Sequence, residues 1–165
     1  MKVAFTGHRE YDSEQYDAAL EQRILALCRD SVERGVQLTF LSGMAVGFDM
    51  AAAEMVCAIR ERYGFDNVLL HAVVPYAMQA EFYSEDNLAR YQILLDKADN
   101  VVVLEESYNQ FVFFKRNDYL VENATQMIAY FDGVNKGGTA YTVRRARKEK
   151  LPTENIFQQS QLSLF

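Results

Sequence analysis

The chain has 165 residues, 50% of them hydrophobic, and a formal net charge of -6. This length and apolar content suit one compact domain with a sizeable core. The acidic balance argues against a surface built mainly to hold a nucleic-acid backbone, although it leaves room for a local basic pocket. We therefore predict that direct DNA binding is not the task of this protein.

Segments with strand and helix patterns alternate along the first half of the chain. Residues 3–6 form a short apolar run that predicts a strand, and residues 38–41 predict the next one. Between them, residues 14–34 repeat apolar side chains on one helical face and stop at Gly35, which suits the end of a helix. An alanine-rich helical pattern then ends near Gly64.

The second half continues this alternation. Residues 68–74 are apolar throughout, which indicates a strand buried on both faces. The remaining predicted elements are helices over 86–98, 116–124 and 139–149, strands over 101–104 and 127–131, and an edge strand near 155–157. Because strands that alternate with helices form right-handed crossovers, we predict a single-domain, Rossmann-like, three-layer α/β/α fold with a mostly parallel sheet. The predicted domain covers residues 1–157, and residues 158–165 form a predicted flexible tail.

A glycine-bearing segment, residues 42–49, lies between a predicted strand and the alanine-rich helix. Glycines at such a junction let the backbone approach a ligand, and the following helix offers unpaired N–H groups to an anion. Residues 6–9 after the first strand and residues 136–139 before the last helix have the same character. Since the carboxyl ends of parallel strands share one edge of a sheet, the three turns predict a phosphate-type ligand site there.

Two residues of these turns allow more than one interpretation. Asp49 is more simply a capping residue in the first helical turn than a ribose contact. With Glu54 it forms a poor acid/base pair, because five residues place the two side chains about 140° apart around a helix. No Ser, Cys or carboxylate partner for His8 is evident from the spacing, which favours a polar ligand contact over a general base.

The order and spacing of five motifs resemble those of the SLOG superfamily, the Rossmann-like group that joins the DNA-processing protein DprA with the LOG cytokinin-activating enzymes. The similarity covers nearly the whole chain and points to the YpsA-like branch. The motifs are residues 5–9, 42–49, 74–76 with Gln79, 116–121, and 132–133 followed by 136–140. SLOG-like domains commonly pair through apolar helix faces, so a homodimer is compatible with this resemblance.

The resemblance implies a pocket for a nucleotide or nucleotide-derived ligand. The predicted ligand-binding residues are Gly7, His8, Arg9, Ser42, Gly43, Met44, Gly47, Asp49, Pro75, Gln79, Arg116, Asn117, Lys136, Gly137, Gly138 and Thr139. Arg9, Arg116 and Lys136 would supply the cations that one or two phosphates need. Arg116 is predicted at a helix start, where a cation opposes the dipole, and this favours a ligand contact. Phe111, Phe113 and Phe114 fit either a lid over a base or ordinary packing.

Two activities of the superfamily are less well supported. LOG-type phosphoribohydrolases carry a glutamate after the last glycine turn, whereas here Arg144 and no acid follows, so we assign no catalytic residue and favour binding over hydrolysis. DprA-like proteins have a basic residue in the second glycine loop, where this chain has Val46. A sensor or adaptor role is therefore the favoured prediction, and hydrolysis of an N-glycosidic bond and DprA-like DNA processing are the alternatives.

The last five residues resemble the pentapeptide with which many bacterial proteins bind the replication sliding clamp. They are Gln161, Leu162, Ser163, Leu164 and Phe165. Leucine and phenylalanine anchors can fill an apolar groove while the glutamine forms directional hydrogen bonds. A terminus that packs back on its own domain is the alternative to clamp binding.

The remaining features indicate a cytoplasmic protein without a membrane partner or a metal site. Cys28 and Cys57 lie on apolar helical faces without the spacing of a metal site, so we predict reduced core residues. The chain runs directly from Met1 into a strand, without the long apolar stretch of a signal peptide or membrane span.

Overall fold

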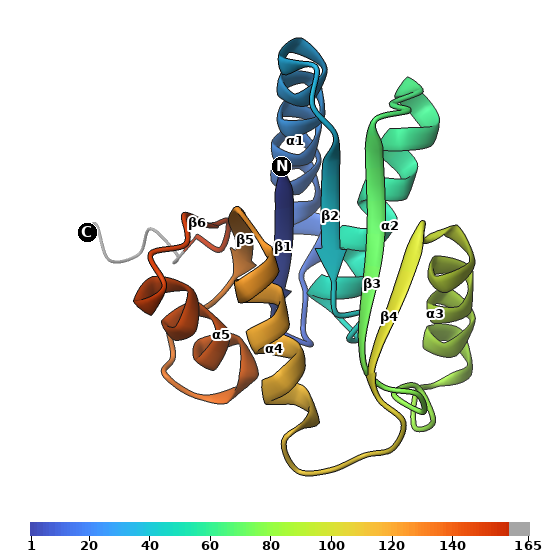
Figure 1. The fold of residues 1–165 in the computed structure, drawn as a ribbon, viewed down its shortest axis with the longest axis vertical. Coiled ribbons are helices and arrows are strands. Elements are labelled where there is room, and N and C mark those ends of the chain that lie inside the picture. Colours follow the sequence, from blue (N-terminus) through green and yellow to red (C-terminus); the bar gives the residue numbers. More distant parts are fainter. Residues whose placement is uncertain (159–165) are drawn as a thin grey trace.

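The structure is a computed structural model that describes residues 1–158, within which six strands form one sheet (Figure 1). The strands are β1 (Lys2–Gly7), β2 (Leu38–Ser42), β3 (Val68–Tyr76), β4 (Asn100–Glu105), β5 (Gln126–Tyr130) and β6 (Thr153–Asn155). The helices are α1 (Ser13–Arg34), α2 (Phe48–Tyr63), α3 (Glu85–Lys97), α4 (Val112–Asn123) and α5 (Gly137–Lys148). Helices and strands alternate as the hydrophobic pattern predicts.

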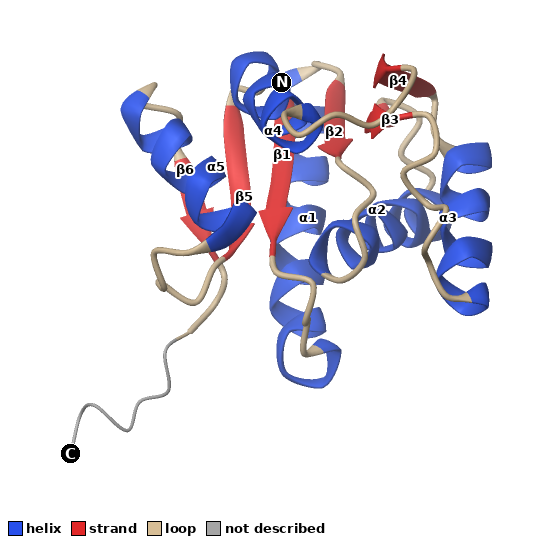
Figure 2. Ribbon diagram, turned by 90° about the horizontal axis from the view of Figure 1, so that it is seen from below, coloured by secondary structure: helices blue, strands red, loops and turns tan. Residues whose placement is uncertain are grey.

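The helices form two layers, one on each face of the sheet. α1, α2 and α3 lie on one side, and α4 and α5 lie on the other (Figures 1 and 2). Successive side chains of β1 alternate between these layers: Val3 and Phe5 pack in the larger core cluster, and Ala4 packs in the smaller one with residues of α4 and α5. The predicted three-layer, Rossmann-like α/β/α fold is confirmed.

The strand order is β4-β3-β2-β1-β5-β6, and every strand pairing within residues 1–158 is parallel. The sheet is thus wholly parallel in this region, where the sequence predicts a mostly parallel one. From β1 the chain moves outward through β2 and β3 to β4, and it then returns to β5 on the other side of β1. The strand order therefore reverses between β1 and β5, and ligands of such sheets bind outside the carboxyl ends at this point.

One predicted helix boundary is wrong in a way that affects the site. α4 begins at Val112 rather than at Arg116, because the Phe111 amide donates to Asn109 Oδ1 (2.8 Å) and the aromatic run continues into the helix. Arg116 therefore lies in the second helical turn, beyond the N-terminal end of the dipole. The electrostatic reason for expecting a ligand contact at Arg116 does not hold.

The last strand also ends earlier than predicted. β6 stops at Asn155 instead of covering residues 155–157. The Asn155 side chain bonds both backbone groups of Phe131, and its Oδ1 also accepts from the Phe157 amide (3.1 Å). These bonds occupy the position at which a longer strand would continue.

The hydrophobic core contains stacked aromatic rings and the two cysteines. Stacked rings of Phe5 and Phe40 lie at its centre, with centroids 5.4 Å apart. Cys28 and Cys57 are buried and form no disulfide, as predicted for core residues. None of the helices within residues 1–158 has both the length and the apolar character needed to cross a membrane.

Candidate functional site

The centre of the candidate site is the backbone carbonyl of Gly43, in the loop between β2 and α2. This oxygen accepts hydrogen bonds from Gln79 Nε2 (3.0 Å) and Arg116 Nη1 (2.8 Å). Gln79 follows β3 and Arg116 belongs to α4, so two separate elements hold the loop. A Cβ at Gly43 would overlap Arg116 Nη1 and lie 2.8 Å from its Cζ, and this close approach requires glycine.

The rest of this loop is fixed by internal hydrogen bonds. Ser42 Oγ donates to the carbonyl oxygen of Asp49 (3.0 Å) and accepts from the Met44 amide (3.2 Å). Tyr83 Oη donates to the Met44 carbonyl (3.2 Å). Met44 has a φ of 56°, a left-handed conformation that is uncommon for a residue other than glycine. The loop is therefore preorganised before any ligand binds.

Two buried oxygens next to this loop lack a hydrogen-bond donor. Asp49 Oδ1 and Gln79 Oε1 accept no hydrogen bond from any group of residues 1–158. Burial raises the pKa of the Asp49 carboxyl to about 6, although the Arg116 charge and the Ala45 amide lower it. Because nearly all buried polar atoms in proteins are hydrogen-bonded, these two acceptors indicate a place where a further group binds.

Side chains of α4 connect the loop to the start of α5. Arg116 Nε donates to Asn117 Oδ1 (2.9 Å), and a Cβ at Gly138 would lie 3.7 Å from Asn117 Nδ2. Burial lowers the pKa of the Arg116 guanidinium, and the Asp49 charge raises it. The structure thus brings together predicted site residues from the β2–α2 region, the turn after β3 and helix α4. We call this group the Gly43 cluster, and its members are Ser42, Gly43, Asp49, Gln79, Arg116 and Asn117.

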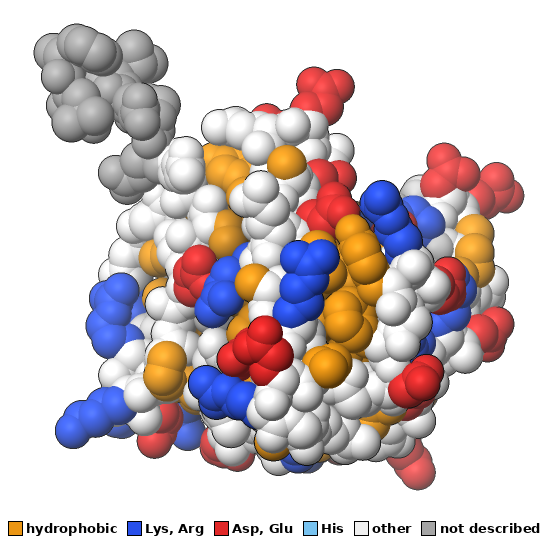
Figure 3. Space-filling model, turned by 90° about the horizontal axis from the view of Figure 1, so that it is seen from above, with side chains coloured by type: hydrophobic (Ala, Val, Ile, Leu, Met, Phe, Trp, Pro, Cys, Tyr) orange, Lys and Arg blue, Asp and Glu red, His pale blue; other side chains and the backbone are white. Residues whose placement is uncertain are grey.

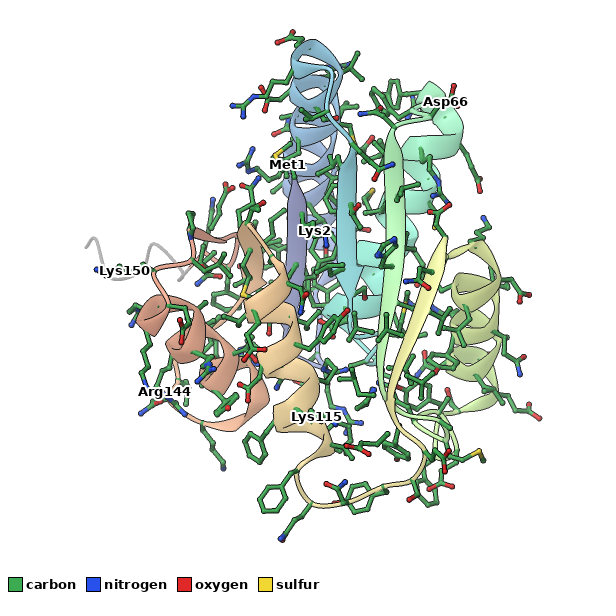
Figure 4. All side chains as sticks on the ribbon, viewed as in Figure 1. Met1, Lys2, Asp66, Lys115, Arg144 and Lys150 are labelled. Atoms are coloured by element: carbon green, nitrogen blue, oxygen red, sulfur yellow. The ribbon has the colours of Figure 1, made fainter. Side chains whose placement is uncertain are left out.

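The turn between β5 and α5 is more open. Lys136 is the N-cap residue of α5, and it is exposed together with Gly137 and Gly138. Thr139, in the first turn of α5, is buried. Pro75 is a buried residue of β3 and lies before the Gln79 turn. Figure 4 shows Lys115 of α4 and Arg144 of α5 in the lower half of the view, towards which the strands point, and Asp66 at the opposite end.

The loop after β1 fixes the start of α2. Gly47 has a φ of 100°, and a Cβ there would lie 2.5 Å from the His8 carbonyl oxygen. That oxygen accepts from the Phe48 amide (3.1 Å), and a Cβ at Gly7 would likewise lie 2.5 Å from Phe48 Cγ. Two of the predicted glycine turns therefore pack directly against each other.

His8 has a carboxylate partner that its sequence spacing does not reveal. Its Nε2 lies 3.1 Å from Asp132 Oδ1 and can pair with that carboxylate only when Nε2 carries a proton; without the proton, Nε2 accepts from the Asp132 amide (3.0 Å). His8 follows β1 and Asp132 follows β5, so the pair spans the point at which the strand order reverses. The expectation that His8 lacks such a partner is wrong, because a contact across 124 positions depends on the strand order alone.

Arg9 lies apart from the Gly43 cluster. It is exposed and lines a cavity of about 480 Å³ with Gly47, Glu54 and Arg90, between the starts of α1 and α2. Arg90 pairs with Glu54, whereas Arg9 has no ion-pair partner in the described part of the chain. The predicted cations Arg9 and Arg116 therefore face different surroundings.

The aromatic residues at the start of α4 border the Gly43 cluster. The Phe113 ring packs against Tyr76 and Tyr108 (6.2 and 6.4 Å between centroids), and the Arg116 guanidinium lies 6.0 Å from its centre. Phe114 packs edge-on against Tyr141 at 4.9 Å. Phe113 and Phe114 thus each contact other rings but remain 42% and 46% exposed, and Phe111 is 62% exposed.

These features can be compared with known proteins. A model of the YspA SLOG family, named YpsA, matches residues 3–161. The chain belongs to the YspA SLOG family. This confirms the resemblance to the SLOG superfamily and to its YpsA-like branch.

Relatives of this YspA SLOG chain occur in bacilli. The chain is 28% identical to a UPF0398 protein of Bacillus thuringiensis (strain Al Hakam) over 162 residues, which cover 90% of this chain and 84% of the relative. The same values hold for a UPF0398 protein of Bacillus cereus (strain Q1). The similarity therefore extends over the candidate site as well as the sheet.

Two solved structures share the fold of this YspA SLOG chain. DNA processing protein A from Helicobacter pylori, whose structure concerns single-stranded DNA binding, has a TM-score of 0.59 and 19% identity. The match covers 93% of this chain but only 63% of that protein. The protein TM1055 has a TM-score of 0.50 and 17% identity, over 92% of this chain and 71% of its own. At these identities the likeness establishes the fold alone.

Proposed function

We propose that this YspA SLOG protein binds a phosphate-bearing, nucleotide-derived small molecule at the carboxyl edge of the sheet, in a sensor or adaptor role. The observation that carries the proposal is the Gly43 cluster, in which Asp49 Oδ1 and Gln79 Oε1 are buried without donors. They lie beside a buried guanidinium and a preorganised loop, at the edge where such sheets bind ligands.

The phosphate is proposed to bind near the start of α5. The N-terminus of this helix offers the amides of its first turn and the positive end of its dipole. Asn117 Nδ2 lies close to Gly138, and the hydroxyl of Thr139 is in the same turn. Exposed Lys136 would add charge at this turn, whereas Arg9 lines the separate cavity beside α2.

A DNA-processing role is less well supported by the charges on the chain. The Helicobacter pylori neighbour is described as binding single-stranded DNA, but this chain has a net charge of -6 and Val46 in its second glycine loop. At the end of the molecule opposite the site, basic side chains alternate with acidic ones and form no continuous track (Figure 3). A bound mononucleotide needs only one or two cations, whereas a strand needs a basic groove.

Equilibrium titration with AMP, adenosine and inorganic phosphate tests the proposal. We expect AMP to bind at least about tenfold more tightly than adenosine, because the phosphate contributes directly to affinity. Native mass spectrometry of the gently purified protein would reveal a co-purifying nucleotide. Equal affinity for AMP and adenosine, or no binding by any nucleoside monophosphate, would contradict the proposal.

Two variants connect this binding to the site. Gly43→Leu should abolish AMP binding, because its side chain would displace Arg116. Gly35→Asn is the control, since Gly35 ends α1 at a φ of 65°, a left-handed conformation that asparagine tolerates, and no atom lies within 4 Å of a Cβ there. A turnover assay on the same AMP samples separates binding from hydrolysis: release of adenine would favour the hydrolase alternative.

We further propose that residues 161–165 tether the protein to the bacterial sliding clamp. This segment lies outside the described residues, and the support is its sequence, Gln161 to Phe165. The domain of residues 1–157 would then act beside replication or repair without gripping DNA itself.

Native mass spectrometry with added sliding clamp tests the tether. The intact chain should form a complex that disappears when residues 161–165 are deleted and weakens at least about tenfold with Phe165→Ala. Phe111→Ala removes an exposed phenylalanine elsewhere on the chain and should leave the complex unchanged. A complex that survives the deletion would show that the tail is not the contact.

A further inference from the structure

Two acceptor oxygens of the Gly43 cluster have no hydrogen-bond donor in residues 1–158, although donor groups lie close by. The donors Gln79 Nε2 and Arg116 Nη1 both bond the Gly43 carbonyl, and Arg116 Nε bonds Asn117. Two acceptors of the same cluster, Asp49 Oδ1 and Gln79 Oε1, have no donor in residues 1–158. Each side chain is 6% exposed. A group that pairs these two oxygens must therefore bring donors.

The two unpartnered oxygens are tied to one short piece of backbone. Gln79 bonds the carbonyl of Gly43, and Asp49 is joined to Ser42 through its own carbonyl. The charges of Asp49 and Arg116 act on each other, and Arg116 bonds the same Gly43 oxygen. Both acceptor residues are thus hydrogen-bonded to residues 42–43, where the chain leaves β2 and leads into α2.

We infer that the ligand is a ribonucleotide rather than a deoxyribonucleotide, with its ribose hydroxyls donating to Asp49 and Gln79. This inference rests on the proposed function and names the sugar that the same site takes. A ribose with free 2′- and 3′-hydroxyls offers two adjacent donors within a few bonds of the 5′-phosphate. An acidic side chain that binds ribose hydroxyls beside a helix N-terminus is a recurrent arrangement in dinucleotide-binding sheets.

The two acceptor oxygens are shielded in this structure, so a side chain next to them must shift for a hydroxyl to reach them. Ligand hydroxyls would then satisfy oxygens that are unfavourable when left unpaired.

Paired titrations with AMP and 2′-deoxyAMP, and with CMP and 2′-deoxyCMP, test the inference. The wild type should bind each ribonucleotide about tenfold or more tightly than its deoxy form, because a site built for a hydroxyl discriminates against its absence. Asp49→Asn should reduce this ratio to less than about twofold, since its amide replaces an acceptor with a donor. Asp66→Asn, at the opposite end of the molecule in Figure 4, should keep the wild-type ratio.

The possible outcomes separate this inference from the proposed function. Tight but equal binding of ribo and deoxy forms would overturn the ribose assignment and leave phosphate-dependent nucleotide binding intact. A preference for AMP and CMP over UMP without a sugar preference would assign the donors to the amino group of a base, and would also overturn it. If Asp49→Asn fails to fold by circular dichroism, Gln79→Leu replaces it, with the same expected loss of discrimination.

Discussion

The two loops on either side of Arg116 and Asn117 are built differently. The β2–α2 loop is buried, and three side chains, two from the segment between β3 and α3 and one from α4, hold it through Gly43 and Met44. In the β5–α5 turn, residues 133–138 are exposed, and a Cβ at Gly138 would have only ordinary contact with its surroundings. We call the β2–α2 loop the fixed half of the proposed site, because burial and hydrogen bonds from other elements hold it, and the exposed β5–α5 turn its adaptable half.

Matched glycine substitutions give the largest expected difference between the halves. Gly43→Ala should lower the free energy of unfolding by about 2–4 kcal/mol, because the new Cβ pushes a buried guanidinium from its hydrogen bonds. Gly138→Ala should change it by less than about 1 kcal/mol, since 3.7 Å is ordinary contact. Urea unfolding of both variants measures this, and equal losses would show that the halves are equally rigid.

The pH dependence of stability sharpens the description of the fixed half. Burial raises the pKa of Asp49 to about 6 in the folded protein, above its value in the unfolded chain. Its contribution to stability is therefore fully present below about pH 4 and is lost as the pH rises through about 6. The total loss is up to about 3 kcal/mol for a shift of this size.

Asp49→Asn removes this titration. Between about pH 4 and pH 7, the decline of the unfolding free energy should be smaller than in the wild type by up to about 3 kcal/mol. Urea unfolding at several pH values measures the difference, and Asp66→Asn, an exposed acid, should follow the wild-type curve. An unchanged slope for Asp49→Asn would mean that Asp49 is not held in a charge-disfavouring environment.

A feature of the fold or of the site could be predicted from the sequence where the residues that form it are close together in the chain. The glycine loops, the alternating elements and the parallel sheet follow from local patterns, since each depends on neighbours within one helix or strand. The contacts Gly43–Arg116 and His8–Asp132 join residues 73 and 124 positions apart, and only the strand order brings them together. The unpartnered oxygens of Asp49 and Gln79 leave no local signal, because a missing donor can be recognised only after folding.

A hydroxyl in each half offers a finer test. Ser42→Ala should lower the free energy of unfolding by about 1–3 kcal/mol, because Ser42 Oγ bonds two buried backbone groups. Thr139→Val should change stability by less than about 1 kcal/mol, since its hydroxyl bonds no group within residues 1–158. AMP affinity should nevertheless fall by several-fold in Thr139→Val. Thermal unfolding and titration of both variants show whether the hydroxyls serve folding and binding separately.

The smallest expected effect belongs to the exposed cation of the adaptable half. Lys136 has no ion-pair partner in the described part of the chain, so Lys136→Ala should alter the unfolding free energy by less than about 0.5 kcal/mol. Its effect should appear in binding: AMP affinity should fall about three- to tenfold at low salt and by less at high salt, because exposed charges are screened. Lys150→Ala, which removes an exposed cation beyond the end of α5, is the control and should leave the affinity unchanged. If the loss of AMP affinity in Lys136→Ala does not depend on salt, Lys136 contacts the phosphate in a buried environment. The β5–α5 turn would then resemble the fixed half once the ligand is bound, despite its exposure in this structure.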